Sequence, residues 1–359
     1  MATRWDAAER LRELIDAVVD EGIAPGLEVV VTRQDGIVYE GAAGWADLAA
    51  RRPMEPRTTA MVYSMTKTVT AVAVLQLVDK RKLSLETPVS TLIPEIPYGD
   101  RVTIRHLLSQ TSGIPNPIPL RWVHLPEEDR TYDERAMLRR RLSESPVLRF
   151  APGDRYAYSN LSYWLLGRAI ELASGVPYPE YVRANVFARL GLAASEAGFT
   201  IPDPRNHASG YLPRWSLLNL LRPVLLDRKF VSEVDGPWVH VKDNYLDGAA
   251  FGGIVASARA MGRFLQDQLA QESVLLGPEG RRLLYEQQRN NAGKTVAMTL
   301  GWHVGTRGGG YLFKEGGGAG FHGEMRLCPS LGVASVVIAN SGAFNVKRFM
   351  ERAERVWAG

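Results

Sequence analysis

The sequence predicts a mixed α/β protein, in which an antiparallel sheet is flanked by helices and a mostly helical region is inserted into the chain. Two β-rich runs near the start are separated by an Asp-Gly turn signal, and a further alternating run lies near the end. Amphipathic helix patterns open and close the chain. We therefore expect the two ends of the chain to share one α/β layer around an inserted helical region.

The elements of this layer follow in order along the chain. Residues 6–20 carry apolar groups at helical i, i+3, i+4 spacing, and strands are predicted at 27–32 and 36–41 on either side of the turn. Near the end, residues 332–339 alternate like a strand, and residues 346–357 form an amphipathic helix pattern. The layer thus begins helix, strand, strand and ends strand, helix.

A buried helix is predicted directly after Ser64, because the residues that follow it are apolar on nearly all sides. Residues from about 85 onward show helical segments and Pro-rich connections. We expect a discontinuous α/β domain of residues 1–84 and 246–359, a mostly helical domain of residues 85–245, and an active site in the cleft between them.

Composition narrows the classes of function. The chain has 359 residues, of which 45% are hydrophobic and 23% charged, as in ordinary globular proteins. The net charge is +4, but the basic residues are scattered, so we expect no nucleic-acid partner. Cys328 is the only cysteine, which excludes an intrachain disulfide and a thiolate-rich zinc site, and we expect it to be buried. The histidines lack metal-binding spacing, and no cofactor is expected.

The sequence also gives an expectation for the cellular location of the protein. The first residues contain no apolar signal-peptide core, and no run approaches the roughly 18 apolar residues of a membrane span, so we expect a cytoplasmic protein without stable membrane insertion. Residues 215–229 have a wide apolar face, which leaves a lid over the cleft, a core helix of the helical domain, or contact with a membrane surface as interpretations. No pattern specifies the oligomeric state.

Ser64 and Lys67 form a Ser-x-x-Lys motif at the start of the buried helix. A serine hydroxyl needs a nearby base, and the Gly-x-Ser-x-Gly elbow of other hydrolases is absent from the sequence. Residues i and i+3 share a helix face, so the Lys67 amine would reach the Ser64 hydroxyl. Burial would lower the pKa of the lysine and let it accept the serine proton.

Three further segments follow this motif in order. Ile104–Ile114 contains His-Leu-Leu-Ser-Gln-Thr-Ser-Gly, Tyr158–Asn160 reads Tyr-Ser-Asn, and Lys314–Gly317 reads Lys-Glu-Gly-Gly. Together with Val62–Lys67, they resemble the class C β-lactamases and the related serine carboxylesterases, D-amino-acid-specific peptidases and D,D-carboxypeptidases. The resemblance covers most of the chain and implies a β-lactamase/transpeptidase-like fold.

The resemblance also implies catalytic roles. Ser64 would be the nucleophile, while Lys67 and Tyr158 would pass its proton to the leaving group, as a pair in which either can be the base. Asn160 would hydrogen-bond the lysine and the substrate. The backbone N–H groups of Ser64 and Gly317 would form an oxyanion hole.

The last segment departs from the family pattern. Lys314, Glu315 and Gly316 would bind substrate, but Glu315 replaces a threonine that helps bind the substrate carboxylate in penicillin-recognising members. A carboxylate there would repel a carboxylate, with Lys314 left to offset it, which favours neutral esters over β-lactams. His322, nearby in sequence, would either reach the pocket or be a satisfied structural histidine.

These observations predict a serine carboxylesterase that cleaves a small-molecule ester through an acyl-enzyme on Ser64, with weak β-lactam hydrolysis. The alternatives are a β-lactamase or D-amino peptidase, and an acyltransferase to an alcohol acceptor. A catalytically silent binding protein is the competing class.

Overall fold

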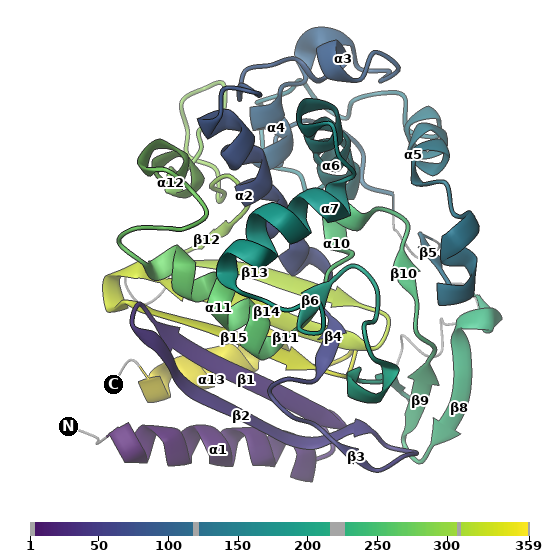
Figure 1. The fold of residues 1–359 in the computed structure, drawn as a ribbon, viewed down its shortest axis with the longest axis vertical. Coiled ribbons are helices and arrows are strands. Elements are labelled where there is room, and N and C mark those ends of the chain that lie inside the picture. The colour runs from purple at the N-terminus through teal and green to yellow at the C-terminus, as the bar shows by residue number, and fades with distance from the viewer. Residues whose placement is uncertain (1–3, 118–121, 216–226, 307–309, 358–359) are drawn as a thin grey trace.

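The computed structural model describes residues 4–117, 122–215, 227–306 and 310–357, and a seven-stranded antiparallel sheet runs through it (Figure 1). Its strands, in spatial order, are β12 (His303–Gly305), β13 (Tyr311–Gly318), β14 (Phe321–Cys328), β15 (Val333–Ala339), β1 (Gly26–Arg33), β2 (Gly36–Asp47) and β3 (Arg52–Pro53). The first and last parts of the chain thus meet in one sheet, and the predicted mixed α/β class is confirmed.

The central strands β1 and β15 are buried on both faces because both faces of the sheet are covered. Val30 and Val336 belong to the large core on the side of α11 (Ala258–Leu269), whereas Val29 and Val337 belong to a smaller core beneath α1 (Arg4–Asp20) and α13 (Val346–Trp357). Figure 1 shows α1 and α13 together on one side of the sheet and α11 on the other. The predicted terminal helices therefore cover one face.

The remaining helices lie beyond α11, on the same side of the sheet (Figure 1). They are α2 (Thr66–Asp79), α3 (Val89–Leu92), α4 (Ile104–Leu108), α5 (Glu134–Ser143), α6 (Asn160–Ser174), α7 (Tyr178–Val182), α10 (Ala249–Gly252) and α12 (Pro278–Tyr285). Helix α2 contacts α6, α10 and α12, and every residue from Thr66 to Leu77 is buried. The prediction of a buried helix after Ser64 is confirmed.

Short strands also occur within the stretch 85–245, which the sequence predicts to be mostly helical, and on either side of it. They form small sheets of β4 (Thr59–Met61), β11 (Val255–Ser257) and β6 (Ala197–Gly198); of β7 (Gly210–Pro213), β9 (Trp238–Val241) and β8 (Val231–Asp235); and of β10 (Tyr245–Leu246) and β5 (Val123–His124). Strands of two to five residues carry too few side chains for a recognisable period. The division into two domains stays a prediction.

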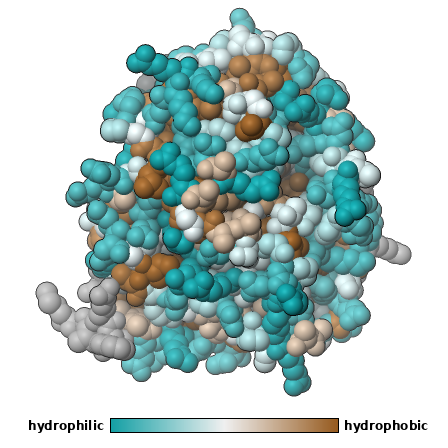
Figure 2. All heavy atoms as spheres, viewed as in Figure 1, coloured by the Kyte–Doolittle hydropathy of each residue, from teal (hydrophilic) through white to brown (hydrophobic). Residues whose placement is uncertain are grey.

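The structure describes only part of the apolar segment 215–229. Trp215 is strongly exposed, but residues 216–226 lie outside the described part of the chain, so the choice between lid and core helix stays a prediction. Figure 2 shows a mostly hydrophilic face with small, separate hydrophobic patches. Among the described helices, none has the length and hydropathy needed to cross a bilayer.

Candidate active site

The turn that contains Ser64, the predicted nucleophile, directly precedes α2 and is called the nucleophile turn below. Residues Tyr63–Met65 form one turn of 3-10 helix, anchored by a hydrogen bond from the Val62 N–H to the Ile254 carbonyl of 3.1 Å. Tyr63 has a φ of +45°, which is unusual for a bulky residue, and its hydroxyl donates to the Ala319 carbonyl at 2.9 Å. Tertiary contacts thus hold a strained turn that sets the position of Ser64.

The Ser64 hydroxyl lies between the side chains of Lys67 and Tyr158. Ser64 Oγ is 3.0 Å from Lys67 Nζ and 2.6 Å from the Tyr158 hydroxyl. Lys67 Nζ also donates to Asn160 Oδ1 at 2.9 Å and to the Phe251 carbonyl at 2.5 Å. Three acceptors therefore surround an amine that has three N–H groups when charged. The structure brings together all four side chains that the motifs predict.

Phe251 is the residue of this cluster that the sequence reasoning missed. It acts through its backbone carbonyl, so its side-chain type carries no signal for the interaction with Lys67. The sequence therefore offered no signal for this contact. Helix α10 holds the carbonyl in place through a second contact, in which the Thr70 hydroxyl donates to the Ala250 carbonyl at 2.7 Å.

Burial shifts the protonation of the cluster. Lys67 is fully buried, and burial together with the charge of Lys314 lowers its pKa well below the usual value. Burial lowers the pKa of Lys314 to about 7. Burial raises the pKa of Tyr158, and the hydrogen bond to Ser64 offsets only part of that effect. The cluster thus favours a neutral amine beside a protonated phenol.

The loop that carries Tyr158 is held by the segment Ile104–Ile114. Gln110, at a φ of +58°, accepts from the Ala157 N–H at 2.8 Å through its backbone carbonyl and from the Ser159 N–H at 2.6 Å through Oε1. Ser159 caps α6 by accepting from the Ser162 N–H. The second motif therefore supports Tyr158 and does not touch the reacting atoms.

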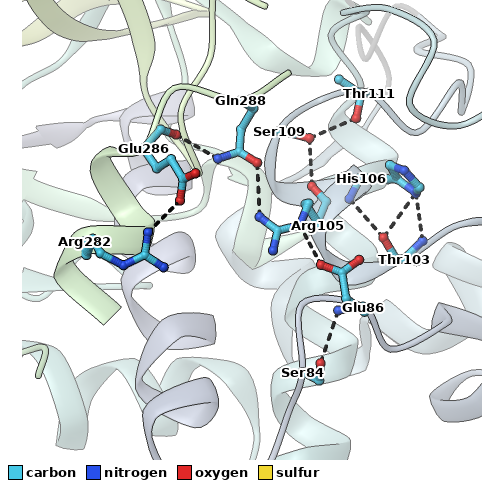
Figure 3. A network of polar contacts seen from close by, with 10 residues as sticks. All are labelled: Ser84, Glu86, Thr103, Arg105, His106, Ser109, Thr111, Arg282, Glu286 and Gln288. Carbon is cyan, nitrogen blue, oxygen red and sulfur yellow. Dashed lines mark hydrogen bonds and ion pairs between the residues drawn. The ribbon is translucent and has the colours of Figure 1, made fainter. Parts of the chain in front are cut away.

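Figure 3 shows how this supporting segment is itself anchored. In α4, Arg105 donates to Glu86 Oε1 at 2.7 Å and to Gln288 Oε1 at 3.2 Å. His106 and Thr103 form a capping box at the start of the helix. Contacts to two other segments of the chain therefore fix α4 and, through it, the Tyr158 loop.

Strand β13 packs against the turn that carries Ser64. Lys314 Nζ lies 5.3 Å from the centre of the Tyr158 ring and has no hydrogen-bond partner among the described residues. A Cβ atom at Gly316 would lie 2.2 Å from the Val62 carbonyl oxygen and 3.2 Å from the Ser64 nitrogen. Only glycine allows this close approach of the strand to the nucleophile turn. The oxyanion hole of Ser64 and Gly317 stays a prediction, and this approach supports it.

Glu315 has a partner that the sequence analysis did not assign. Its Oε1 lies 2.6 Å from His322 Nε2 on β14, so His322, and not Lys314, offsets its charge. The side chain of Glu315 is 46% exposed. Elsewhere in the described ranges, no group of three or more His, Cys, Asp or Glu residues is arranged to hold a metal ion. Cys328 is buried, as predicted, and burial raises the pKa of its thiol to about 12.

A family model described as "Beta-lactamase" matches residues 11–356 of the chain. The protein therefore belongs to the beta-lactamase family, as the motifs predicted.

Two curated relatives match parts of the sequence. Esterase EstB of Burkholderia gladioli is 35% identical over 223 residues, which are 57% of this chain and 54% of the esterase. Penicillin-binding protein 4* of Bacillus subtilis (strain 168) is 26% identical over 278 residues, which are 76% of this chain and 58% of that protein. The chain thus spans little more than half the length of these relatives.

Solved structures share the fold. D-amino acid amidase from Ochrobactrum anthropi SV3 superposes with a TM-score of 0.80 at 20% identity, covering 98% of both chains. The octameric penicillin-binding protein homologue from Pyrococcus abyssi superposes with a TM-score of 0.75 at 23% identity, over 97% of this chain and 76% of that one. The predicted β-lactamase/transpeptidase-like fold is confirmed.

Proposed function

We propose that this protein is a serine hydrolase that cleaves small carboxylic esters through an acyl-enzyme on Ser64. The observation that carries the proposal is the position of the Ser64 hydroxyl, within 3.0 Å of Lys67 Nζ and 2.6 Å of the Tyr158 hydroxyl. Similarity to an esterase over 57% of the chain supports the ester as substrate. Among serine hydrolases, this arrangement replaces the histidine base with a lysine and a tyrosine.

In the proposed acylation step, Ser64 Oγ attacks the ester carbonyl while neutral Lys67 takes its proton. The lowered pKa of Lys67 and the raised pKa of Tyr158 favour this order of roles in the free protein. The backbone N–H groups of Ser64 and Gly317 would stabilise the oxyanion of the tetrahedral intermediate.

Collapse of the tetrahedral intermediate expels the alcohol, which receives its proton from the phenol of Tyr158. Lys67 then returns a proton to Tyr158, since both groups contact Ser64 Oγ. Water attacks the acyl-enzyme in the second half of the reaction, and the same pair takes the proton of that water. Asn160 would keep Lys67 in place through its 2.9 Å hydrogen bond and would contact the substrate.

Turnover of p-nitrophenyl acetate, butyrate and octanoate, measured beside nitrocefin, tests the proposal. Wild type should hydrolyse at least one of the esters and be labelled by a fluorophosphonate, whereas Ser64→Ala should lose both properties. Ser174→Ala, a serine substitution at the end of α6, is the matched control and should keep both. Ester hydrolysis that survives Ser64→Ala would overturn the assignment of the nucleophile.

The same assays separate the alternatives. Nitrocefin turnover above ester turnover would indicate a β-lactamase, and faster cleavage of D-phenylalanine amide would indicate a D-amino peptidase. An ester product formed in the presence of added butanol would indicate acyl transfer to an alcohol. No turnover and no covalent adduct would indicate a binding protein.

A further inference from the structure

Glu315 and His322 form an ion pair across β13 and β14, and β13 packs against the turn that carries Ser64. His322 Nε2 lies 2.6 Å from Glu315 Oε1, and His322 Nδ1 lies 2.6 Å from the Phe344 carbonyl oxygen. A carbonyl oxygen only accepts, so Nδ1 carries a hydrogen. The second ring nitrogen faces a carboxylate, so the surroundings favour an imidazolium that donates from both nitrogens.

The pair lies where β13 has a free edge within the described part of the chain, since β12 pairs only with Tyr311–Phe313, and its side chains point to the opposite face of the strand from Lys314 and Gly316. Glu315 stands between Lys314, which lies over the Tyr158 ring, and Gly316, which lies against the Ser64 nitrogen. The His322 ring packs on Gly317, where an added Cβ would be 2.9 Å from the ring. The negative charge of Glu315 raises the pKa of Tyr158, so the field of the carboxylate reaches the site.

Other charged groups act on the pair from the elements around it. They are Glu324 on β14, which influences both members; Lys347 on α13, which influences Glu315; and Tyr158 on the loop before α6. Glu324 is itself paired with Arg326, with 2.6 Å between the closest nitrogen and oxygen. Besides the proton on His322, the charges of Lys314 and Glu324 change near neutral pH, because burial brings both pKa values to about 7, so the comparison with Glu315→Gln isolates the contribution of the pair.

We propose that Glu315 and His322 form a charge-selecting subsite for esters that carry an ammonium group. With His322 protonated, the pair has no net charge, and neutral and cationic esters are accepted alike. With His322 neutral, the half-exposed carboxylate of Glu315 has no counter-ion and attracts a cationic substrate. This inference rests on the proposed ester hydrolysis and specifies its substrate.

The direction of the pH dependence follows from the surroundings of His322. Burial lowers the pKa of the imidazole, but the hydrogen bond and charge of Glu315 and the Phe344 carbonyl more than offset that effect, so the pKa lies above the usual value. Above this pKa the proton leaves and Glu315 becomes unpaired. The preference for cations should therefore rise on the alkaline side.

The test compares substrates of matched shape between pH 6 and 9. On the acyl side these are the p-nitrophenyl esters of 4-(trimethylammonio)butyrate and of its neutral isostere 5,5-dimethylhexanoate. On the alcohol side they are acetylthiocholine and S-(3,3-dimethylbutyl) thioacetate. The quaternary ammonium groups do not titrate, so a change in the ratio of cationic to neutral kcat/KM reports on the protein.

In wild type, the ratio should rise about five- to tenfold with pH in at least one series, the size expected for one unit charge several ångströms away in a partly solvated site. In His322→Gln the ratio should already be high at pH 6 and should change less with pH than in wild type. In Glu315→Gln it should be low throughout. Glu40→Gln, a carboxylate substitution on β2, four strands away in the sheet, should behave like wild type.

A ratio that rises equally in wild type and Glu315→Gln, or that rises in neither series, would overturn the inference. Turnover of the neutral esters in that case would leave the proposed hydrolase intact. Failure of wild type to hydrolyse any ester, with Ser64 unlabelled by a fluorophosphonate, would instead remove the proposed function. If His322→Gln fails to fold, the ratio measured in Glu315→Gln is enough to support or overturn the inference.

Discussion

Lys67 is a buried amine whose partners within the described ranges are all neutral groups. Asn160 Oδ1 and the Phe251 carbonyl accept its two N–H groups when it is neutral, Ser64 Oγ lies 3.0 Å away, and no carboxylate is hydrogen-bonded to it there. A carboxylate partner would hold the proton on the amine, whereas burial and the nearby Lys314 drive it off. The side chain is thus prepared to accept a proton without a histidine.

Lys314→Met tests this electrostatic role. The charge of Lys314 lowers the pKa of Lys67, so its removal should raise that pKa and move the acid limb of the kcat/KM profile for p-nitrophenyl butyrate to higher pH. The variant should melt at the same temperature or higher, because a buried cation is replaced by an apolar side chain. Lys294→Met, on an exposed lysine, is the control; an unshifted acid limb in Lys314→Met would contradict the role.

Tyr158→Phe tests the phenol as proton donor. Loss of this group should lower kcat/KM for the esters by about 10²- to 10⁴-fold, the range typical of general acid–base groups. Tyr156→Phe removes a hydroxyl two residues away, which contacts His303 at 3.1 Å, and should change kcat/KM little. Equal losses in the two variants would indicate a disturbed loop and not a lost donor.

At the scale of elements, two side chains of the candidate site flank the start of α6: Asn160 is its first residue, and Tyr158 lies two positions earlier. Ser159 lies between Tyr158 and Asn160 and caps the helix. The cap therefore fixes the backbone that carries both of these side chains. Helix α11 is capped in the same way by Ser257, which accepts from the Ala260 N–H at 3.1 Å. The two caps provide a matched comparison.

Ser159→Ala and Ser257→Ala should each cost about 1 kcal/mol of stability, the usual value of a lost serine cap. Only Ser159→Ala should also lower kcat/KM, because its cap positions Tyr158 and Asn160. Thermal unfolding and ester turnover of both variants measure these effects. Activity lost in both variants to the same degree would show that the cap acts through stability alone.

Long helices could be predicted from the sequence, whereas short strands and contacts between residues far apart in the sequence could not. The helices Arg4–Asp20 and Val346–Trp357 show a period over three or more turns, and the predicted bounds agree with the structure to within two residues. Four side chains of the candidate site follow from spaced motifs. The Phe251 carbonyl and the partnership of Glu315 with His322 depend on tertiary contacts that no local pattern encodes.

At the scale of the whole molecule, stability should depend on pH through buried histidines. His207 is 3% exposed, hydrogen-bonds Thr59 Oγ1 at 3.1 Å, and has its pKa lowered to about 3 by burial and by the charge of Arg52. The folded state therefore binds fewer protons than the unfolded chain between about pH 6.5 and pH 3. Stability from this group is present above pH 6.5 and is lost as the pH falls.

His207→Gln should make this contribution visible. The variant should be less stable than wild type at pH 7, and its penalty should shrink by about 2 kcal/mol at pH 5, because only wild type pays the cost of keeping the imidazole neutral. Urea unfolding of both proteins at the two pH values measures the change. A penalty that stays constant with pH would show that folding leaves the pKa of His207 unchanged.

The hydrogen bonds around Ser64 and Lys67 join residues 93, 94 and 184 positions apart in the chain. Contacts between such distant segments form slowly during folding, because a long loop must close before each one is made. During refolding from urea, far-ultraviolet circular dichroism should therefore recover before ester turnover does. The recovery of enzymatic activity would then report the rate of the last stage of folding, in which the distant segments make their contacts.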